Sequence, residues 1–449
     1  MARVASMGQA AGFARRRMLA WGKQTRGYPR NVYLLLLFTL GKGLQLSIGQ
    51  VTLSLYAYSI GYRQDFVGLL VAIPSLGALV AALPVGFLAD RMPRKPLLLI
   101  TGLLNPIALA LIGLTTRAPL MLAAGVANGI LSSAYWVTII PMLTESVEPR
   151  QRVSVMSLNT FLMLGVGSLG GLLGGAIPEL VSRITGLSAT SPVPLRWGVV
   201  AAAIAVFLPT APLFWLKEGA ATTESDPATD TPLTADATGA AALTETPVEP
   251  SVAAKAVHPS MRPIPLLFLL LLIPDVLYTA GEGAVVALEP LFFHLRFNLN
   301  PALIGTLVAG GGLLVGVTAL LAPSIVRRYG KLRVITTAQL LSAPIALAIG
   351  YAPWLWLSAA GDIGRSFLRG AFEPVYATFA MERVDARYRA RLSGFYSVTW
   401  SIGYSLGAAG SGWLQRNVSL SVGFLMGGVL LAAAPTWLLL AFSRDPNVD

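Results

Sequence analysis

The sequence has no cysteine, only two histidines and few charged residues, which make up 12% of its 449 positions. Without cysteine there is no disulfide framework. The two histidines, His258 and His294, lie far apart in the chain and offer no zinc site. A soluble domain carries about 25% charged residues, so the low charge argues against a water-soluble fold. We expect no metal ion and no other cofactor.

Long apolar runs make up most of the chain, which is 55% hydrophobic with a mean hydropathy of +0.67. A helix of about 20 apolar residues crosses a hydrocarbon core about 30 Å thick. Runs of that kind occupy approximately residues 31–59, 66–89, 96–115, 119–143, 153–178 and 197–216, and then 264–293, 302–326, 333–352, 354–381, 391–413 and 420–442. The sequence therefore predicts an all-α membrane protein with twelve transmembrane helices.

A polar segment divides the twelve runs into two sets of six. Residues 218–262 are rich in Ala, Thr, Pro and acids and have few large apolar residues, which is typical of a disordered linker. We predict a basic N-terminal tail over 1–30, a six-helix bundle over 31–217, a cytoplasmic linker over 218–262, a second six-helix bundle over 263–442 and a short C-terminal tail over 443–449.

The formal charge of +12 comes from basic residues in the segments between spans, which argues against a nucleic-acid partner. With the N-terminus inside, 24 Lys and Arg residues fall on the cytoplasmic side and 6 on the other side. This bias predicts that both termini are cytoplasmic. We expect an integral protein of a bacterial inner (plasma) membrane that works as a monomer surrounded by lipid.

The two halves also repeat one another. A shift of 237 positions places Gly68 on Gly305 and Glu145 on Glu382, with no gap across the intervening positions. Two six-helix halves that run in the same direction are expected to be related by an axis along the membrane normal. A solute site then lies at their interface, near the middle of the bilayer.

A charged turn follows the second apolar run. It reads as a Gly, three residues, Asp-Arg, two residues and two basic residues, namely Gly86, Asp90, Arg91, Arg94 and Lys95. This pattern resembles the signature of the major facilitator superfamily between helices 2 and 3, although Pro93 stands where that family usually has Gly. The resemblance covers essentially the whole chain. It implies two pseudo-symmetric six-helix bundles and transport by alternating access.

The same turn is expected to form a cytoplasmic gate. Gly86 allows a neighbouring helix to approach, and Asp90 accepts hydrogen bonds from the start of another helix, which the resemblance identifies as helix 11. Arg91 or Arg94 is expected to pair with Glu145. The predicted gate residues are Gly86, Asp90, Arg91, Arg94, Lys95, Glu145, Arg150, Glu382 and Arg387. The alternative is that these charges only set the topology.

The fifth apolar run is rich in glycine. It contains Gly165, Gly167, Gly170, Gly171, Gly174 and Gly175. The run resembles the antiporter motif of drug:proton exporters in the same superfamily, although Gly171 replaces a Pro of that motif. The resemblance implies export, whereas close packing of helices through small residues is the alternative.

Ionisable residues inside the predicted spans are candidates for function, because burying them in a membrane is costly. The tenth predicted span, over residues 354–381, carries four ionisable residues: Asp362, Arg365, Arg369 and Glu373. Their spacing of 3, 4 and 4 positions places them on one helical face. Lys42 and Glu282 each stand between two glycines at corresponding positions of helices 1 and 7. Opposite charges on facing helices can form an ion pair across the cavity, and the sequence leaves open whether these two residues touch.

Together with Asp275, the spans hold four acids and three bases, so one carboxylate lacks a full cationic partner. We predict that Asp275 or Glu282 binds and releases a proton during transport. The alternative is a static network that holds the halves together. Polar and aromatic residues complete the predicted cavity: Gln45, Asn128, Tyr135, Trp136 and Trp400.

These patterns predict a secondary transporter for a small solute, coupled to protons, and not an enzyme. An ATP-driven pump requires a phosphate-binding loop ending in Gly-Lys-Ser or Gly-Lys-Thr, which the sequence lacks. We favour efflux of amphiphilic or drug-like compounds. Proton-linked uptake of a sugar or another metabolite, and a membrane sensor that transports nothing, are the alternatives.

Overall fold

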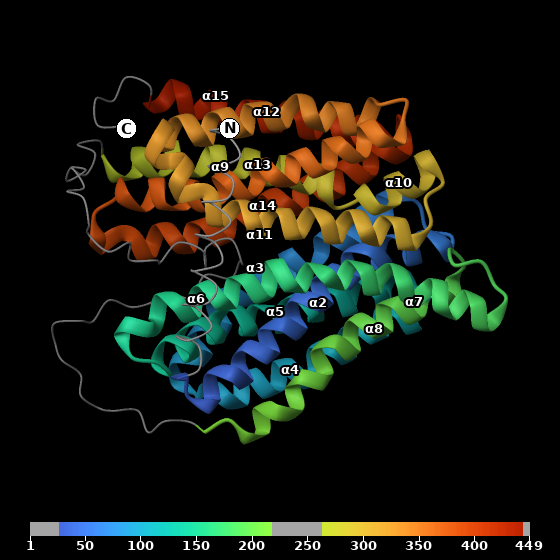
Figure 1. Ribbon diagram of the computed structural model, residues 1–449, viewed down its shortest axis with the longest axis horizontal. Coiled ribbons are helices and arrows are strands. Elements are labelled where there is room, and N and C mark those ends of the chain that lie inside the picture. The colour runs from blue at the N-terminus through green and yellow to red at the C-terminus, as the bar shows by residue number, and fades with distance from the viewer. Residues whose placement is uncertain (1–26, 218–262, 443–449) are drawn as a thin grey trace, which may run out of the picture.

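The computed structural model describes residues 27–217 and 263–442, which form helices and contain no strand. The helices form two bundles that lie side by side, the first from residues 27–217 and the second from residues 263–442 (Figure 1). The predicted linker lies outside the described residues, as do most of the predicted N-terminal tail and the C-terminal tail. The site described below lies between the two bundles.

The first bundle contains the first six predicted spans. Its helices are α2 (Arg30–Ser59), α3 (Gln64–Arg91), α4 (Arg94–Leu114), α5 (Ala118–Glu145), α6 (Arg152–Thr160), α7 (Gly170–Thr185) and α8 (Pro192–Thr210). Between α6 and α7, the fifth span passes through a π-helical turn at Phe161–Val166 and a 3-10 turn at Gly167–Leu169. A Cβ on Gly167 would lie 2.7 Å from the Cα of Gly43, so glycine allows this irregular segment to pack closely against α2.

The second bundle contains the other six spans. Its helices are α9 (Ile264–Val286), α10 (Glu289–Phe297), α11 (Pro301–Tyr329), α12 (Lys331–Tyr351), α13 (Leu355–Glu382), α14 (Ala386–Asn417) and α15 (Val422–Phe442). The expectation of one unbroken helix over 264–293 is wrong, because α9 ends at Val286 and α10 begins at Glu289. Pro290 stands in the first turn of α10, where the missing N–H is tolerated. This break positions Glu289 at the site.

Ten of the twelve described spans are long and apolar enough to cross a membrane. The other two, α13 and α14, have 28 and 32 residues and are long enough to do so, but they are more polar. In α13 the extra polarity comes from the four ionisable residues noted above. The predicted class, an all-α membrane protein with twelve helices in two six-helix bundles, is confirmed.

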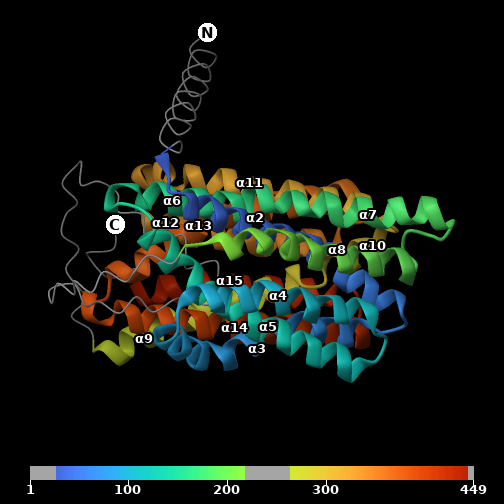
Figure 2. The same ribbon diagram turned by 90° about the horizontal axis from the view of Figure 1, so that it is seen from below.

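The bundles are joined mainly by two pairs of helices, α3 with α14 and α11 with α7 (Figure 2). We call these contacts the two seams. A Cβ on Gly68 of α3 would lie 3.0 Å from the Cα of Gly412, and a Cβ on Gly305 of α11 would lie 3.1 Å from the backbone N of Gly175. Gly68 and Gly305 occupy equivalent positions under the shift of 237. The repeat therefore supplies the same close backbone contact twice.

A second feature of the repeat lies at the basic end, which holds Arg91–Lys95 and residues 327–333. There Arg94 at the start of α4 forms an ion pair with Glu145 at the end of α5. Lys331 at the start of α12 forms the equivalent ion pair with Glu382 at the end of α13. Each pair joins two helices of the same bundle. These contacts therefore stiffen each half.

An ion pair also joins the two halves at the opposite end. Arg416 in the last turn of α14 contacts Asp65 in the first turn of α3. Both side chains are partly exposed, so the pair contributes about 0–1 kcal/mol. We expect Arg416→Gln to shift the conformational equilibrium toward separation of this end by up to about fivefold.

The measurement is the reactivity of a single cysteine introduced near Asp65, which the cysteine-free chain allows. Arg183→Gln, an exposed arginine of α7 at the same end, is the control. Equal reactivity in the two variants at low ionic strength would show that the Arg416 pair does not favour closure.

Candidate functional site

A cavity of about 390 Å³ lies between the two halves. From the first half it is lined by Gly43, Leu46, Ser47, Gln50, Pro74, Ser75, Ala78, Asn128, Gly129, Ser132, Trp136, Met163, Leu164 and Ser168. From the second half it is lined by Val286, Glu289, Pro290, Phe293, Ile304, Leu307, Val308, Gly311, Gly312, Val315, Asp362, Arg365, Ser366, Arg369, Glu373, Trp400 and Ser401. The first side carries no charged residue, whereas the second carries five.

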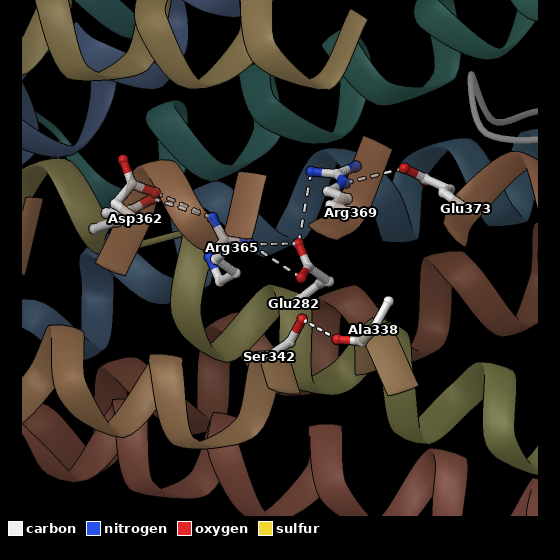
Figure 3. Close-up of polar contacts among 8 residues, drawn as sticks. Glu282, Ala338, Ser342, Asp362, Arg365, Arg369 and Glu373 are labelled. Carbon is white, nitrogen blue, oxygen red and sulfur yellow. Dashed lines mark hydrogen bonds and ion pairs between the residues drawn. The ribbon is translucent and has the colours of Figure 1, made fainter. Parts of the chain in front are cut away.

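Arg365 is the centre of the charged side. Its guanidinium lies 3.0 Å from the carboxylate of Glu282 on α9 and 3.5 Å from that of Asp362 on its own helix (Figure 3). It also lies 3.6 Å from the carboxylate of Glu289 on α10. Arg365 is only 3% exposed. Three carboxylates from three helices thus converge on one buried guanidinium, whose planar set of donors suits such contacts.

Arg369, one turn further along α13, extends the network. Its Nε donates to Glu373 at 3.1 Å, and its Nη1 lies 3.6 Å from Glu282, which therefore bridges both arginines (Figure 3). We call the six residues Glu282, Glu289, Asp362, Arg365, Arg369 and Glu373 the charged cluster. It contains four carboxyl groups and two guanidinium groups. The cluster is acid-rich unless protons or a ligand balance it.

The local sequence explains how the charged cluster forms. The spacing of 3, 4 and 4 positions sets the α13 residues on the face that the second half turns to the cavity. Glu282 and Glu289 stand seven positions apart, about two helical turns, so they reach the same side of α13 although the helix breaks between them. Glu289 is absent from the predicted site. Its seven-residue separation from Glu282 is the sequence signal that points to it.

Lys42 occupies a separate polar network in the first half. Its ammonium donates to Ser132 Oγ at 3.0 Å and to Asn105 Oδ1 at 3.3 Å. Gln45 donates to the same Asn105 oxygen at 2.9 Å. The ion pair between Lys42 and Glu282 that the sequence allows is therefore absent from this conformation, because each residue is held by neighbours of its own half.

The remaining predicted cavity residues divide into two groups. Asn128, Trp136 and Trp400 line the cavity. Tyr135 instead lies in the interior of the first bundle, fully buried, where its hydroxyl donates to Thr39 at 3.1 Å. Asp275 is also buried away from the cavity lining, and its carboxylate accepts a hydrogen bond from the Thr399 hydroxyl on α14.

The predicted gate residues lie at the basic end. Arg94 contacts Glu145, as described above, and Arg91 stacks on Phe87 with 3.8 Å between its guanidinium carbon and the ring centre. Lys95 donates to the carbonyl groups of Phe214 and Leu216 beyond the end of α8.

In the second half, Glu382 pairs with Lys331, and Arg387 lies 3.9 Å from Asp385. Gly86 and Arg150 are at the same end, and a Cβ on Gly86 would meet no atom within 4 Å. No described contact therefore uses the lack of a side chain at Gly86. The side chain of Asp90 lies outside what the structure describes.

The sequence matches the family model of the Major Facilitator Superfamily over residues 35–361 and again over residues 271–449. The chain belongs to the Major Facilitator Superfamily. This membership identifies a membrane transporter of small molecules rather than an enzyme. The match spans both bundles, including the helices that carry the charged cluster and the Lys42 network.

Several solved structures share this superfamily fold. The nucleoside transporter NupG superposes with a TM-score of 0.65 at 14% identity, covering 93% of this chain and 100% of that chain. A bacterial homologue of the human lysosomal transporter Spinster, in an inward-facing and occupied conformation, gives a TM-score of 0.64 at 15% identity and coverage of 91% and 94%. The human organic anion transporter MFSD10 gives 0.58 at 18% identity and coverage of 91% and 100%.

No curated protein sequence matches this member of the superfamily. At identities this low, the solved structures establish the fold alone. The structural neighbours are named for different solutes, so they do not support the drug:proton antiporter branch in particular. That assignment remains a prediction that rests on the glycines of the fifth span.

Proposed function

We propose that this transporter exports a small amphiphilic solute in exchange for protons, with the cavity between the halves as its binding site. The observation that carries the proposal is the composition of that cavity. Its lining combines Trp136, Trp400 and Phe293 with the polar and charged groups of α5 and α13. Pockets that bury an apolar body and orient a few polar groups have this composition.

The proton coupling is proposed from the buried acids. Asp275 has a neutral hydroxyl as its hydrogen-bond partner and, in the described part of the chain, no cation within ion-pair distance. Other ionisable groups near it are Glu373, Tyr376 and Tyr396, none of which is basic. Protonation of Asp275 removes a buried and uncompensated charge. Glu282, the other predicted carrier, contacts two guanidinium groups, so we assign the proton to Asp275.

The conformational cycle is proposed to follow the duplicated architecture. The halves rock about the cavity, so that the basic end and the opposite end open in turn. The ion pairs of Glu145 and Glu382 hold each half rigid. A latch between the halves is proposed to form where Gly86 and Asp90 approach the start of α14 when the basic end closes, a contact that Gly86 does not make in the described conformation. The basic end is proposed to face the cytoplasm, on the strength of the Lys and Arg distribution.

A transport assay with Asp275→Asn tests the coupling. A thermal-shift screen at two pH values first selects a solute that stabilises the protein. In proteoliposomes, the variant is expected to lose accumulation driven by a pH gradient while it retains exchange of labelled for unlabelled solute, because exchange needs no net proton movement.

Glu179→Gln, an acid of α7 that does not line the cavity, is the matched control. Full gradient-driven accumulation by the Asp275→Asn protein would refute the assignment of the proton to this residue. Absence of transport by the unmodified protein, for every solute that stabilises it, would refute the proposed function as a whole.

A further inference from the structure

Opposite kinds of uncompensated charge lie at the two sides of the cavity, in the lining of the second half and, in the first half, at Lys42 directly behind the lining residue Ser132. On the side of the second half, the charged cluster brings four carboxyl groups against two guanidinium groups. On the side of the first half, Lys42 is 2% exposed and bonds only to neutral Ser132 and Asn105 among the described residues. Charge buried without a partner is unfavourable, so each side favours a ligand group of the opposite sign.

Each side also has at least one buried polar atom that has no hydrogen-bond partner within the described residues. On the first side this atom is the amide Nδ2 of Asn128, which can only donate. On the second side these atoms are Oε1 of Glu289, whose carboxyl group contacts Arg365 at 3.6 Å, and Nε of Arg365, whose other nitrogens form the ion pairs described above. All three residues line the cavity. Buried polar atoms in native proteins are normally satisfied, so the free donor of Asn128 and the free acceptor of Glu289 indicate positions that a ligand fills.

The Asn128 position is connected to Lys42 by hydrogen bonds. Asn105 Nδ2 donates to the backbone carbonyl of Asn128 at 3.1 Å, and the other atom of the same amide accepts from Lys42 at 3.3 Å. Ser132, which Lys42 contacts directly, also lines the cavity. An acceptor group of a ligand that reaches Asn128 and Ser132 therefore lies one hydrogen bond away from the ammonium group.

We propose that the solute is a zwitterion that lies across the cavity. Its anionic group binds Asn128 and Ser132 in the field of Lys42, its cationic group binds Glu289 in the charged cluster, and its apolar body contacts the aromatic lining. A singly charged cation leaves the Lys42 side unmatched. A singly charged anion leaves the excess of carboxyl groups unmatched. This inference rests on the proposed function and specifies its substrate class.

Two zwitterionic probes test the proposal by direct binding to the purified full chain in detergent. Phenylalanine has adjacent charges, and 4-(aminomethyl)phenylacetate has its charges on opposite sides of a ring. Each is compared with its methyl ester, which is only cationic, and with its N-acetyl derivative, which is only anionic. At least one zwitterion is expected to bind at least tenfold more tightly than both of its derivatives.

Variants then assign the two ends of the probe. Glu289→Gln is expected to weaken the zwitterion and the ester by at least tenfold and to leave the N-acetyl derivative within twofold. Lys42→Gln is expected to weaken the zwitterion and the N-acetyl derivative and to leave the ester within twofold. A purely structural role of either residue would weaken all three ligands alike. If the Lys42 variant does not fold, Asn128→Ala supplies the same comparison.

Three results would overturn the inference. An ester or an N-acetyl derivative that binds as tightly as its zwitterion in both series excludes recognition of both ends. So does a variant that weakens all three ligands equally, and so does the absence of binding by any of the six probes. Because binding is measured without a membrane or a gradient, these outcomes are independent of proton coupling. Binding of a zwitterion without its transport in proteoliposomes would contradict the proposed function and leave the inference standing.

Discussion

Replacement of Arg365 by methionine is expected to lower the stability of the protein by about 3–5 kcal/mol, which is typical of breaking a buried ion pair. The substitution leaves Glu282, Asp362 and Glu289 without their shared cation, in a place where Arg365 itself is only 3% exposed. Methionine fills much of the same volume, so the loss arises mainly from uncompensated charge. The measurement is the free energy of unfolding in detergent, or the unfolding temperature where unfolding is irreversible.

A double variant separates charge from packing. Arg365→Met combined with Glu289→Gln removes a carboxylate whose ion pair with Arg365 is lost and is expected to recover part of the loss of stability. Arg296→Met, an exposed arginine at the end of α10, is the matched control and is expected to change stability by less than about 0.5 kcal/mol. If Arg365→Met is as mild as Arg296→Met, the charged cluster does not depend on its central guanidinium.

Substitution of Gly305 by valine is expected to abolish most transport without unfolding the protein. The new Cβ would lie 3.1 Å from the carbonyl carbon of Gly171 and 3.1 Å from the N of Gly175, both of which are backbone atoms of α7. Forced overpacking costs about 1–3 kcal/mol. In the proposed cycle, α7 and α11 separate when the end opposite the basic end opens, so the equilibrium is expected to shift toward that state by roughly 5- to 150-fold.

Gly310→Val offers a control on the same helix, since a Cβ there meets no atom within 4 Å. Both variants place the same residue in the interior of α11, so propensity cancels in the comparison. Transport is measured in proteoliposomes. The opening of the seam is measured as the reactivity of a cysteine introduced beside Gly171. Normal transport by the Gly305→Val protein would show that this seam is not required to close.

Much of the fold follows from the pattern of apolar runs, because helices that cross a bilayer must satisfy their backbone internally. The shift of 237 positions also anticipated that Gly68 and Glu145 have counterparts in the second half. The break between α9 and α10 was not anticipated. Its cause is local, since Pro290 favours the start of a new helix within a run that remains apolar on both sides.

The site was predictable where one helix carries the whole signal. The spacing from Asp362 to Glu373 placed four side chains on one face of α13, and all four line the cavity. The partners of Lys42 were not predictable, because contacts between helices depend on rotation and depth that spacing along one helix does not contain. Tyr135 illustrates the same limit, because the sequence pattern around an aromatic residue is the same whether its side chain faces a cavity or the interior of a bundle.

The paired glycines of the two seams define how the halves can move. Gly68 and Gly305 are repeat equivalents, so the two contact points are expected to lie at the same depth in the bilayer, one on each side of the cavity. Two points at equal depth define a line parallel to the membrane surface. Rotation of one half relative to the other about that line separates the halves at the basic end and leaves both backbone contacts nearly unchanged. The duplicated glycine contact is thus expected to act as the hinge when the basic end opens, and to break when the opposite end opens.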